Sequence, residues 1–175
     1  MVHQEENAAL LALRGGLRGR FRRSFDCMEN AFEVLQDRLD HTATPAERAE
    51  LTPLLDEILA DLTPLAQKNG ISLGAQCDDI SIVGSDALIY RLLFNLIENG
   101  IKYNRPNGSV SVAVHQEADQ VSLRVSDTGF GISQEYRDSI FQPFFRVDKS
   151  RSRKMGGVGL GLALVREIAV LHGGS

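Results

Sequence analysis

Several residue types are scarce in this 175-residue chain, which has no tryptophan, two cysteines and five prolines. Cys27 and Cys77 lack the spacing of a metal site and the company of a disulfide framework, so we expect a reduced, cytosolic setting. The best candidate for a membrane span, 88–97, is interrupted by Arg91 and Asn95 and is far shorter than the roughly 20 residues required. No secretory signal is visible at the start.

The chain also lacks an excess of positive charge, since its net charge is −4. Nucleic-acid-binding domains usually carry a basic field and aromatic stacking surfaces, and aromatic residues make up only 6% of this chain. The five arginines between residues 14 and 23 alternate with apolar residues as on a helix surface, so no nucleic-acid partner is expected. The remaining composition, 43% hydrophobic and 24% charged, is typical of a globular domain.

The pattern before residue 70 is helical. Apolar residues recur every three or four positions over 21–39, and again over a second predicted helix from about 46 to 68. Asn69-Gly70 is a typical helix end, whereas Pro53 and Pro64 are expected to kink the helix or to start a new segment. We therefore expect a helical segment over 1–68.

The spacing of apolar residues changes after residue 70. Apolar and polar residues alternate over 110–114 and 121–125, which predicts an antiparallel hairpin. The other predicted elements are short strands at 71–73 and 80–83, a strong helix at 85–103, a short helix near 134–140 and a last helix at 160–171. Strands with one polar face and helices on the other predict a two-layer α/β sandwich over 69–175.

The predicted helix at 85–103 carries a polar stripe opposite its apolar one. Asn95, Asn99 and Lys102 are spaced by four and three, so they share a face. An asparagine carbonyl is a neutral oxygen ligand for Mg²⁺, and a lysine ammonium pairs with phosphate. The stripe is suited to a metal–triphosphate, with an ordinary solvated helix face as the alternative.

Two glycine-containing loops follow. The loop 127–131 begins with Asp127 at a strand end, where a carboxylate can accept a hydrogen bond from an exocyclic amine such as that of adenine. The loop 156–161 opens the last helix, whose free N–H groups form an anion site. The loop 156–161 lacks the residue pattern of a P-loop, and no hydrophobic strand precedes it as in a dinucleotide-binding fold. The alternative for 127–131 is a plain Asp–Gly turn, and the alternative for 156–161 is a glycine hinge without a ligand.

Aromatic and then basic residues fill the segment between these loops. The aromatics could anchor a loop against the core, and the basic side chains could neutralise a triphosphate. A solvated charge run is the alternative. The residues concerned are Phe141, Phe144, Phe145 and Arg146, followed by Lys149, Arg151, Arg153 and Lys154.

In this order the motifs resemble the ATP-binding domain of sensor histidine kinases, in the superfamily that includes heat-shock chaperones, type II topoisomerases and mismatch-repair ATPases. The resemblance runs from about residue 65 to residue 175. It covers an N box at 95–103, a first glycine box at 127–131, an F box at 141–146 and a second glycine box at 157–165. It implies a Bergerat-type ATP-binding fold, and the helical segment over 1–68 that precedes it resembles a truncated dimerisation or linker region.

The resemblance also implies an ATP site with Mg²⁺ as cofactor. Asn99 would ligate the metal with Asn95 nearby, Lys102 would meet phosphate, and Asp127 would bind the adenine amine. Guanine would place a carbonyl oxygen against that carboxylate, which favours adenine. The other implied nucleotide contacts are Tyr103, Gly129, Gly131, Ile132, Phe141, Gly157, Val158, Gly159, Leu160, Gly161 and Leu162.

In the family, the segment corresponding to about 132–156 is a mobile lid with a basic residue that stabilises the transferring phosphate. Arg146, Lys149, Arg151 and Arg153 are all candidates for that residue.

Two family features are missing from the sequence. None of the four histidines lies in an H box, the run that carries the phosphorylated histidine of these kinases. The family also continues past a Gly-Gly pair like 173–174 with further strands, so we expect an unfinished sheet edge. The chain is thus expected to lack both the phosphoacceptor and the usual last strands.

We expect a protein-histidine kinase domain that binds Mg-ATP and presents the γ-phosphate to a histidine on another segment, in cis or in trans. Its implied partners are ATP or ADP, an H-box dimerisation helix and a response-regulator receiver domain, with homodimerisation through the helices at 21–68. The parent of such a cytoplasmic module is often a membrane-anchored receptor. The alternatives are a pseudokinase or signalling interaction module, and a related ATPase or serine kinase, against which the Phe-rich box argues.

Overall fold

The computed structural model describes residues 48–118, 120–147 and 159–174. The predicted helix at 21–39 lies outside them. The described elements are β1 (Arg48–Glu50), α3 (Leu51–Asn69), β2 (Ser72–Cys77), β3 (Ser81–Val83), α4 (Asp86–Lys102), β4 (Ser109–Glu117), β5 (Gln120–Asp127), the 3-10 turn η1 (Gln134–Tyr136) and α6 (Gly161–Leu171).

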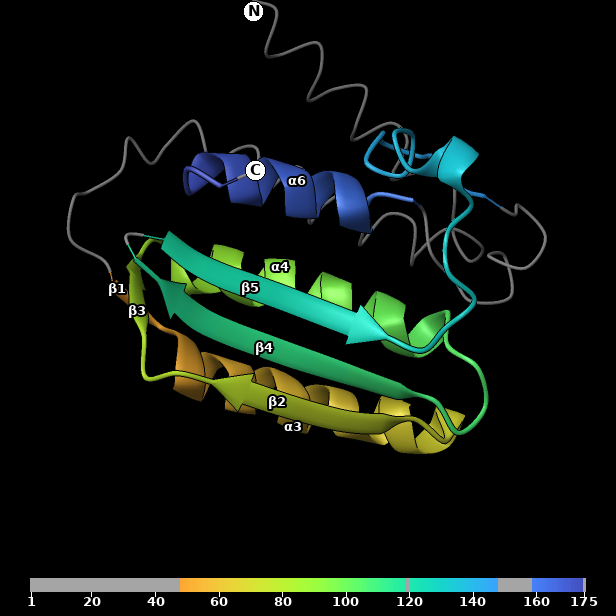
Figure 1. The fold of residues 1–175 in the computed structure, drawn as a ribbon, viewed down its shortest axis with the longest axis horizontal. Helices are drawn as coiled ribbons and strands as arrows, with labels where there is room; N and C mark the ends of the chain where they lie inside the picture. Colours follow the sequence, from red (N-terminus) through yellow and green to blue (C-terminus); the bar gives the residue numbers. More distant parts are fainter. Residues whose placement is uncertain (1–47, 119, 148–158, 175) are drawn as a thin grey trace, which may run out of the picture.

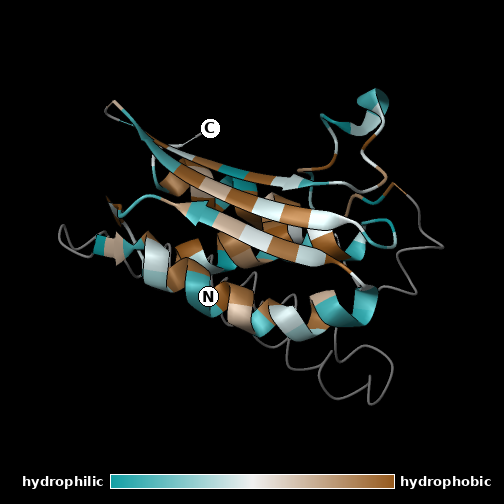
Figure 2. Cartoon of the chain, turned by 60° about the horizontal axis from the view of Figure 1, so that its bottom comes forward, coloured by the Kyte–Doolittle hydropathy of each residue, from teal (hydrophilic) through white to brown (hydrophobic). Residues whose placement is uncertain are grey.

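Three strands form the main sheet of the described region, in the order β2-β4-β5 (Figure 1). The central strand β4 runs parallel to β2 and antiparallel to β5. Val110, Val112 and Val114 alternate along β4 and point into the core, each no more than 2% exposed. Figure 2 shows this alternation as brown and pale bands along the strands. The period-two pattern therefore buries one face of the sheet, as predicted.

Helices α3 and α4 cover the buried face of the sheet, and α6 packs on α4 (Figure 1). The apolar residues of α4 step by four through Ile89, Leu93, Ile97 and Ile101, and all four are buried. Apolar residues of α3 from Leu51 to Ala66 join the same core as the valines of β4. The predicted two-layer α/β sandwich is confirmed. The boundary expected after residue 68 does not separate two cores, because α3 packs directly on the sheet domain.

The predicted helix start near residue 46 is wrong. Residues 48–50 are extended and pair antiparallel with β3, and the helix begins at Leu51, whose N–H donates to Ile80 O at 3.0 Å. The sequence around Arg48 favours a helix locally, but strand pairing satisfies its backbone and buries Ala49 completely.

Neither proline interrupts α3. Pro53 lies in its first turn, where the missing N–H is not needed, and Pro64 is accommodated inside the helix. The helix ends as predicted at Gly70, which adopts a left-handed φ of 66°. The short helix predicted near 134–140 is reduced to η1 and turns, whereas the helix predicted at 160–171 is confirmed as α6.

Candidate functional site

The polar stripe of α4 meets the start of α6 at Gly161. A Cβ on Gly161 would lie 2.8 Å from Asn95 Oδ1 and 3.8 Å from Asn99 Nδ2, so a larger residue here would require the Asn95 side chain to shift. The Nδ2 of Asn95 donates to Arg91 O at 2.7 Å, which fixes the amide. The structure thus brings the predicted asparagine stripe and the predicted glycine loop together, although 60 or more residues separate them in sequence.

Asn99 is the member of this stripe with an uncommitted amide. Its side chain has no hydrogen-bond partner within the described part of the chain. Lys102 differs, because its Nζ lies 2.6 Å from Glu98 Oε1 in an i,i+4 ion pair. A phosphate that reaches Lys102 would have to compete with that carboxylate.

The loop after β5 is tied to the end of α4. Gly129 N donates to Asp127 Oδ1 at 2.7 Å, and Phe130 N donates to Tyr103 O at 3.2 Å. A Cβ on Gly129 would overlap the carbonyl oxygen of Tyr103 and would lie 2.6 Å from Asp127 Oδ1. The second carboxylate oxygen, Asp127 Oδ2, receives no hydrogen bond from the described residues, and Asp127 as a residue is exposed. It is therefore available to a ligand that approaches beside Tyr103.

A hydrogen-bonded network that sequence reasoning missed holds this loop in place. Asn104 Nδ2 donates to Gly100 O and Ser109 O, both at 2.9 Å. Thr128 Oγ1 donates to Asn104 Oδ1 at 3.0 Å and accepts from Ser109 N at 2.8 Å. An Asn after a helix and a Thr in an Asp–Gly turn are ordinary local signals, but nothing local predicts that they bond to each other.

The F box reaches the second glycine box through one backbone contact. Phe144 N donates to Gly159 O at 2.9 Å, and a Cβ on Gly159 would lie 2.8 Å from Phe145 O. Phe145 packs on Tyr136 with ring centroids 6.0 Å apart, so this aromatic residue does anchor its segment. Phe141 is half-buried, as are Leu160 and Leu162 beyond the glycine box.

Arg146 has an unusual environment at the end of the F box. Its Nη2 is buried and has no hydrogen-bond partner among the described residues. Buried polar groups are nearly always paired, so an unpaired guanidinium nitrogen marks a place for an anion. The other lid candidates Lys149 and Arg151, and the glycine-box residues Gly157 and Val158, lie outside the described residues.

Apolar side chains are exposed around the Asp127 loop. Ile132 is 41% exposed, Tyr103 is 40% exposed and Phe130 is 53% exposed. Arg105 lies over the ring of Phe130 at 5.8 Å from its centroid. Gly131 has a left-handed φ of 70°, which turns the chain away from the sheet at this point.

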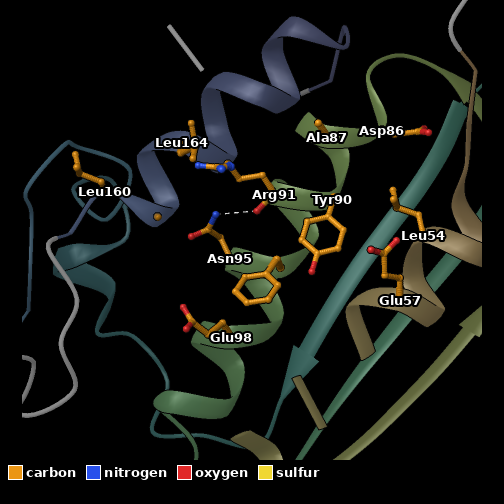
Figure 3. A pocket seen from close by; sticks show the side chains of 12 residues that line it. Leu54, Glu57, Asp86, Ala87, Tyr90, Arg91, Asn95, Glu98, Leu160 and Leu164 are labelled. Carbon is orange, nitrogen blue, oxygen red and sulfur yellow. Dashed lines mark hydrogen bonds between the residues drawn. The ribbon is translucent and has the colours of Figure 1, made fainter. Parts of the chain in front are cut away.

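An open pocket of about 750 Å³ lies between α3, α4 and α6 (Figure 3). Asn95 and Gly161 form part of its wall, so the pocket adjoins the asparagine stripe. The Tyr90 hydroxyl donates to Asp61 Oδ2 at 2.5 Å and links α4 to α3. Burial, followed by this hydrogen bond and the charges of Asp61 and Glu57, raises the pKa of Tyr90 to about 12.

The described residues contain no group of three or more His, Cys, Asp and Glu side chains that could hold a metal ion. The Asn99 amide oxygen fits a different kind of metal site. Mg²⁺ commonly keeps several waters and binds through one or two protein oxygens plus substrate phosphates. A magnesium ion would thus depend on the nucleotide as well as on Asn99.

Residues 84–175 match the protein family described as histidine kinase-, DNA gyrase B-, and HSP90-like ATPase. Because this match covers more than half of the sequence, the chain belongs to that family. Together with the fold, the membership identifies 84–175 as an ATP-binding domain of this class.

Similar proteins are sensor kinases. The sensor histidine kinase RppB of Synechocystis is 35% identical over 148 residues, which cover 81% of this chain and 32% of RppB. The sensor-like histidine kinase SenX3 of Mycolicibacterium smegmatis is 41% identical over 95 residues, which cover 54% of this chain and 24% of SenX3. The chain therefore spans about a third or less of the length of these relatives.

Solved structures give the same fold. The mycobacterial sensor histidine kinase MprB aligns with a TM-score of 0.65 and 27% identity, over 74% of this chain and 81% of that one. The nucleotide-free catalytic domain of the histidine kinase ThkA aligns with a TM-score of 0.63 and 25% identity, over 72% of this chain and 80% of that one. Within the described residues, no helix is long and apolar enough to cross a membrane.

Replacement of Gly129 by alanine is expected to lower the free energy of unfolding by about 1–3 kcal/mol, because the new Cβ overlaps the carbonyl oxygen of Tyr103. Urea denaturation measures this change. Gly74→Ala is the matched control, since no heavy atom lies within 4 Å of a Cβ there. Equal stability of the two variants would contradict the tight approach at Gly129.

Tyr90 is expected to ionise at a higher pH than a tyrosine with the ordinary pKa of 10.0. A raised pKa stabilises the fold below the ordinary value of 10.0, and this contribution is lost as the pH rises toward 12. Ultraviolet titration of phenolate should show one late step, which Tyr90→Phe removes and the control Tyr136→Phe retains. Ionisation of all tyrosines in one step near pH 10 would contradict the assignment.

Proposed function

We propose that this chain is the ATP-binding catalytic domain of a sensor histidine kinase, which binds Mg-ATP and presents the γ-phosphate to a histidine on another segment. The approach of Gly161 to Asn95 and Asn99 carries this proposal, because it sets a helix start beside an uncommitted amide ligand. The names of the similar proteins support the kinase class.

Adenine would bind at Asp127. Its Oδ1 already accepts from Gly129 N, and the Oδ2 of this exposed residue can accept a hydrogen bond from the adenine amine. Guanine presents a carbonyl oxygen at that position, so two acceptors would face each other without a proton between them. Tyr103 and Ile132, both partly exposed near the loop, would border the base.

The triphosphate would lie toward the start of α6. The first N–H groups of a helix have no partner within the helix, and its dipole favours negative charge. Asn99 would supply an amide oxygen to magnesium, and Lys102 would exchange its Glu98 partner for phosphate. Magnesium, when bound, neutralises part of the phosphate charge.

We further propose that Arg146 is the basic residue that faces the transferring phosphate. Its buried and unpaired Nη2 needs an acceptor, and a γ-phosphate oxygen supplies one. An imidazole nitrogen of the acceptor histidine would attack the γ-phosphorus while the bond to the bridging oxygen breaks and ADP leaves with the electron pair. Arg146 would offset charge on the phosphoryl oxygens during this step.

The partners follow from the proposed class. An H-box helix, in cis or in trans, would supply the histidine, and a response-regulator receiver domain would take the phosphoryl group from it. Homodimerisation would involve the part of 21–68 that precedes this domain, because α3 is buried in the domain core. In such a case a cytoplasmic module would sit below a membrane-anchored sensor.

The Asp127→Asn variant should bind ATP about tenfold to a hundredfold more weakly, since it replaces a charged acceptor with an amide. Calorimetric titration with ATP, ADP and GTP, with and without Mg²⁺, measures this loss together with the preference for adenine. Asn99→Ala should remove the magnesium dependence. The exposed Asp79→Asn is the control for a lost carboxylate and should bind as the original chain does. Unchanged ATP affinity in Asp127→Asn would reject the site.

Arg146→Ala should slow phosphoryl transfer to an added H-box helix by about a hundredfold or more, because phosphate-facing arginines act mainly in the transition state. ADP affinity should hardly change, since ADP lacks the γ-phosphate. Arg124→Ala, on the exposed side of β5, is the matched control and should transfer at the original rate. Equal loss of ADP and ATP binding in Arg146→Ala would instead indicate a structural role.

A further inference from the structure

The side-chain amide of Asn104, which lies just beyond the end of α4, uses all of its hydrogen-bonding capacity within the chain. Its Nδ2 donates to Gly100 O and Ser109 O, both at 2.9 Å. Its Oδ1 accepts from Arg105 N at 2.9 Å and from Thr128 Oγ1 at 3.0 Å. An amide has two N–H donors and two lone pairs on its oxygen, so no bond is left over for a ligand. Asn104 therefore holds other groups in place and does not bind a nucleotide itself.

The surroundings of Asn104 require an amide. Aspartate has the same shape, but it would turn a carboxylate oxygen toward two carbonyl oxygens that need N–H donors. Gly108 closes the site from another side, because a Cβ there would overlap Asn104 Oδ1 and would lie 2.6 Å from Thr128 Oγ1. A side chain at 108 would thus require these two partners to move. The pair is held by its neighbours as well as by its own bond.

Thr128 is tied to its neighbours through both its backbone and its side chain. Its N–H donates to Ser109 O at 3.1 Å, and its Oγ1 accepts from Ser109 N at 2.8 Å. A hydroxyl has one proton to donate, and Asn104 Oδ1 at 3.0 Å is closer to Thr128 Oγ1 than Ser109 O is at 3.5 Å. Asn104 is therefore the acceptor of that proton, and the bond joins the end of α4 to the loop 127–131.

Asp127 rests on the turn of α4 to which Asn104 is bonded. A Cβ on Gly100 would lie 3.5 Å from Asp127 Cβ, and Gly100 O is one of the two acceptors of the Asn104 amide. Further along the loop, Phe130 N donates to Tyr103 O at 3.2 Å. The stem of the Asp127 carboxylate therefore lies between α4 and a loop that is bonded to the residues following α4.

We propose that Asn104 is a positioning residue that determines the preference of the site for adenine over guanine. The inference rests on the proposed nucleotide site. Through Thr128, Asn104 keeps the Asp127 carboxylate at the place where guanine would present its carbonyl oxygen. On a looser loop the carboxylate could move aside and accept hydrogen bonds from the N–H groups of guanine, so rejection of guanine requires a fixed carboxylate.

The phosphate end of the proposed site is separate from this network. Among the described residues, no side-chain hydrogen bond of Asn104 or Thr128 reaches Asn95, Asn99 or Gly161. Loss of the network should therefore weaken ATP and ADP binding by the same factor, because both nucleotides carry the same base. It should weaken GTP binding less, which distinguishes positioning of the carboxylate from general damage to the fold.

Thr128→Val tests the inference in the full chain, because valine keeps the branched shape and removes the hydroxyl. In calorimetric titrations, ATP and ADP should both bind about threefold to tenfold more weakly, while GTP binding falls less or rises. Thr128→Ser retains the hydroxyl and should restore the original preference. Thr63→Val is the matched control, because it removes a threonine hydroxyl in α3 that donates to Leu59 O at 2.6 Å. It should leave the affinities and the preference unchanged.

A double-mutant cycle with Asn104→Ala shows whether the two residues act through their common bond. Asn104→Ala alone should weaken ATP binding, and adding Thr128→Val should cause little further loss. Losses that multiply would overturn the assignment. If circular dichroism shows that Asn104→Ala does not fold, the comparison of Thr128→Val with Thr128→Ser decides the inference by itself.

The titrations separate this inference from the proposed function. An unchanged preference for ATP over GTP in Thr128→Val would overturn the role of Asn104 and leave the nucleotide site standing. Equal losses of ATP and GTP binding would do the same, since they indicate a structural role only. No preference for ATP over GTP in the original chain would reject the proposed site and this inference together.

Discussion

The close approach of α6 to α4 at Gly161 is the constraint on which the candidate site depends. A side chain at this position would meet Asn95 Oδ1 and would require the Asn95 amide to move from its place beside the helix start. With glycine at position 161, the first N–H groups of α6 lie close to the side-chain amides of Asn95 and Asn99 on α4. This arrangement joins an anion-binding helix end to neutral oxygen ligands, which is the chemistry that a metal–triphosphate needs.

Helix α4 is the element through which the parts of the molecule are connected. Its apolar side packs on β4, and Gly100 lets the sheet come close, with Val110 carbons 3.1 and 3.3 Å from the position of a Cβ. Its polar side carries Asn95, Asn99 and Lys102. Its end is bonded through Asn104 to Thr128, next to Asp127. A shift of α4 would therefore move both ends of the proposed ATP site at once, whereas a shift of α3 would first disturb the pocket that Tyr90 bridges.

Local sequence signals determine some elements of this chain, and contacts between distant residues determine others. Elements whose apolar residues recur at a clear period, such as α4 and the β4–β5 hairpin, lie where the sequence indicates. Gly70 ends α3, as expected of a glycine after a helix. Residues 48–50 were expected to be helical and are extended, because β3 offers them partners that the local sequence does not reveal. The Asn104–Thr128 bond escaped notice for the same reason, since its two side chains are 24 residues apart.

The residue pattern alone was sufficient for the two-layer class, for the order of the four motifs and for the chemical type of each candidate residue, because periodicity and side-chain chemistry are local properties. Three-dimensional packing was needed to show that Gly161 touches the asparagine stripe, that Lys102 is paired with Glu98, and that Arg146 holds a buried unpaired nitrogen. Each of these contacts depends on which surfaces of the elements meet. Burial of the shared apolar core determines how the elements pack, and local preference does not.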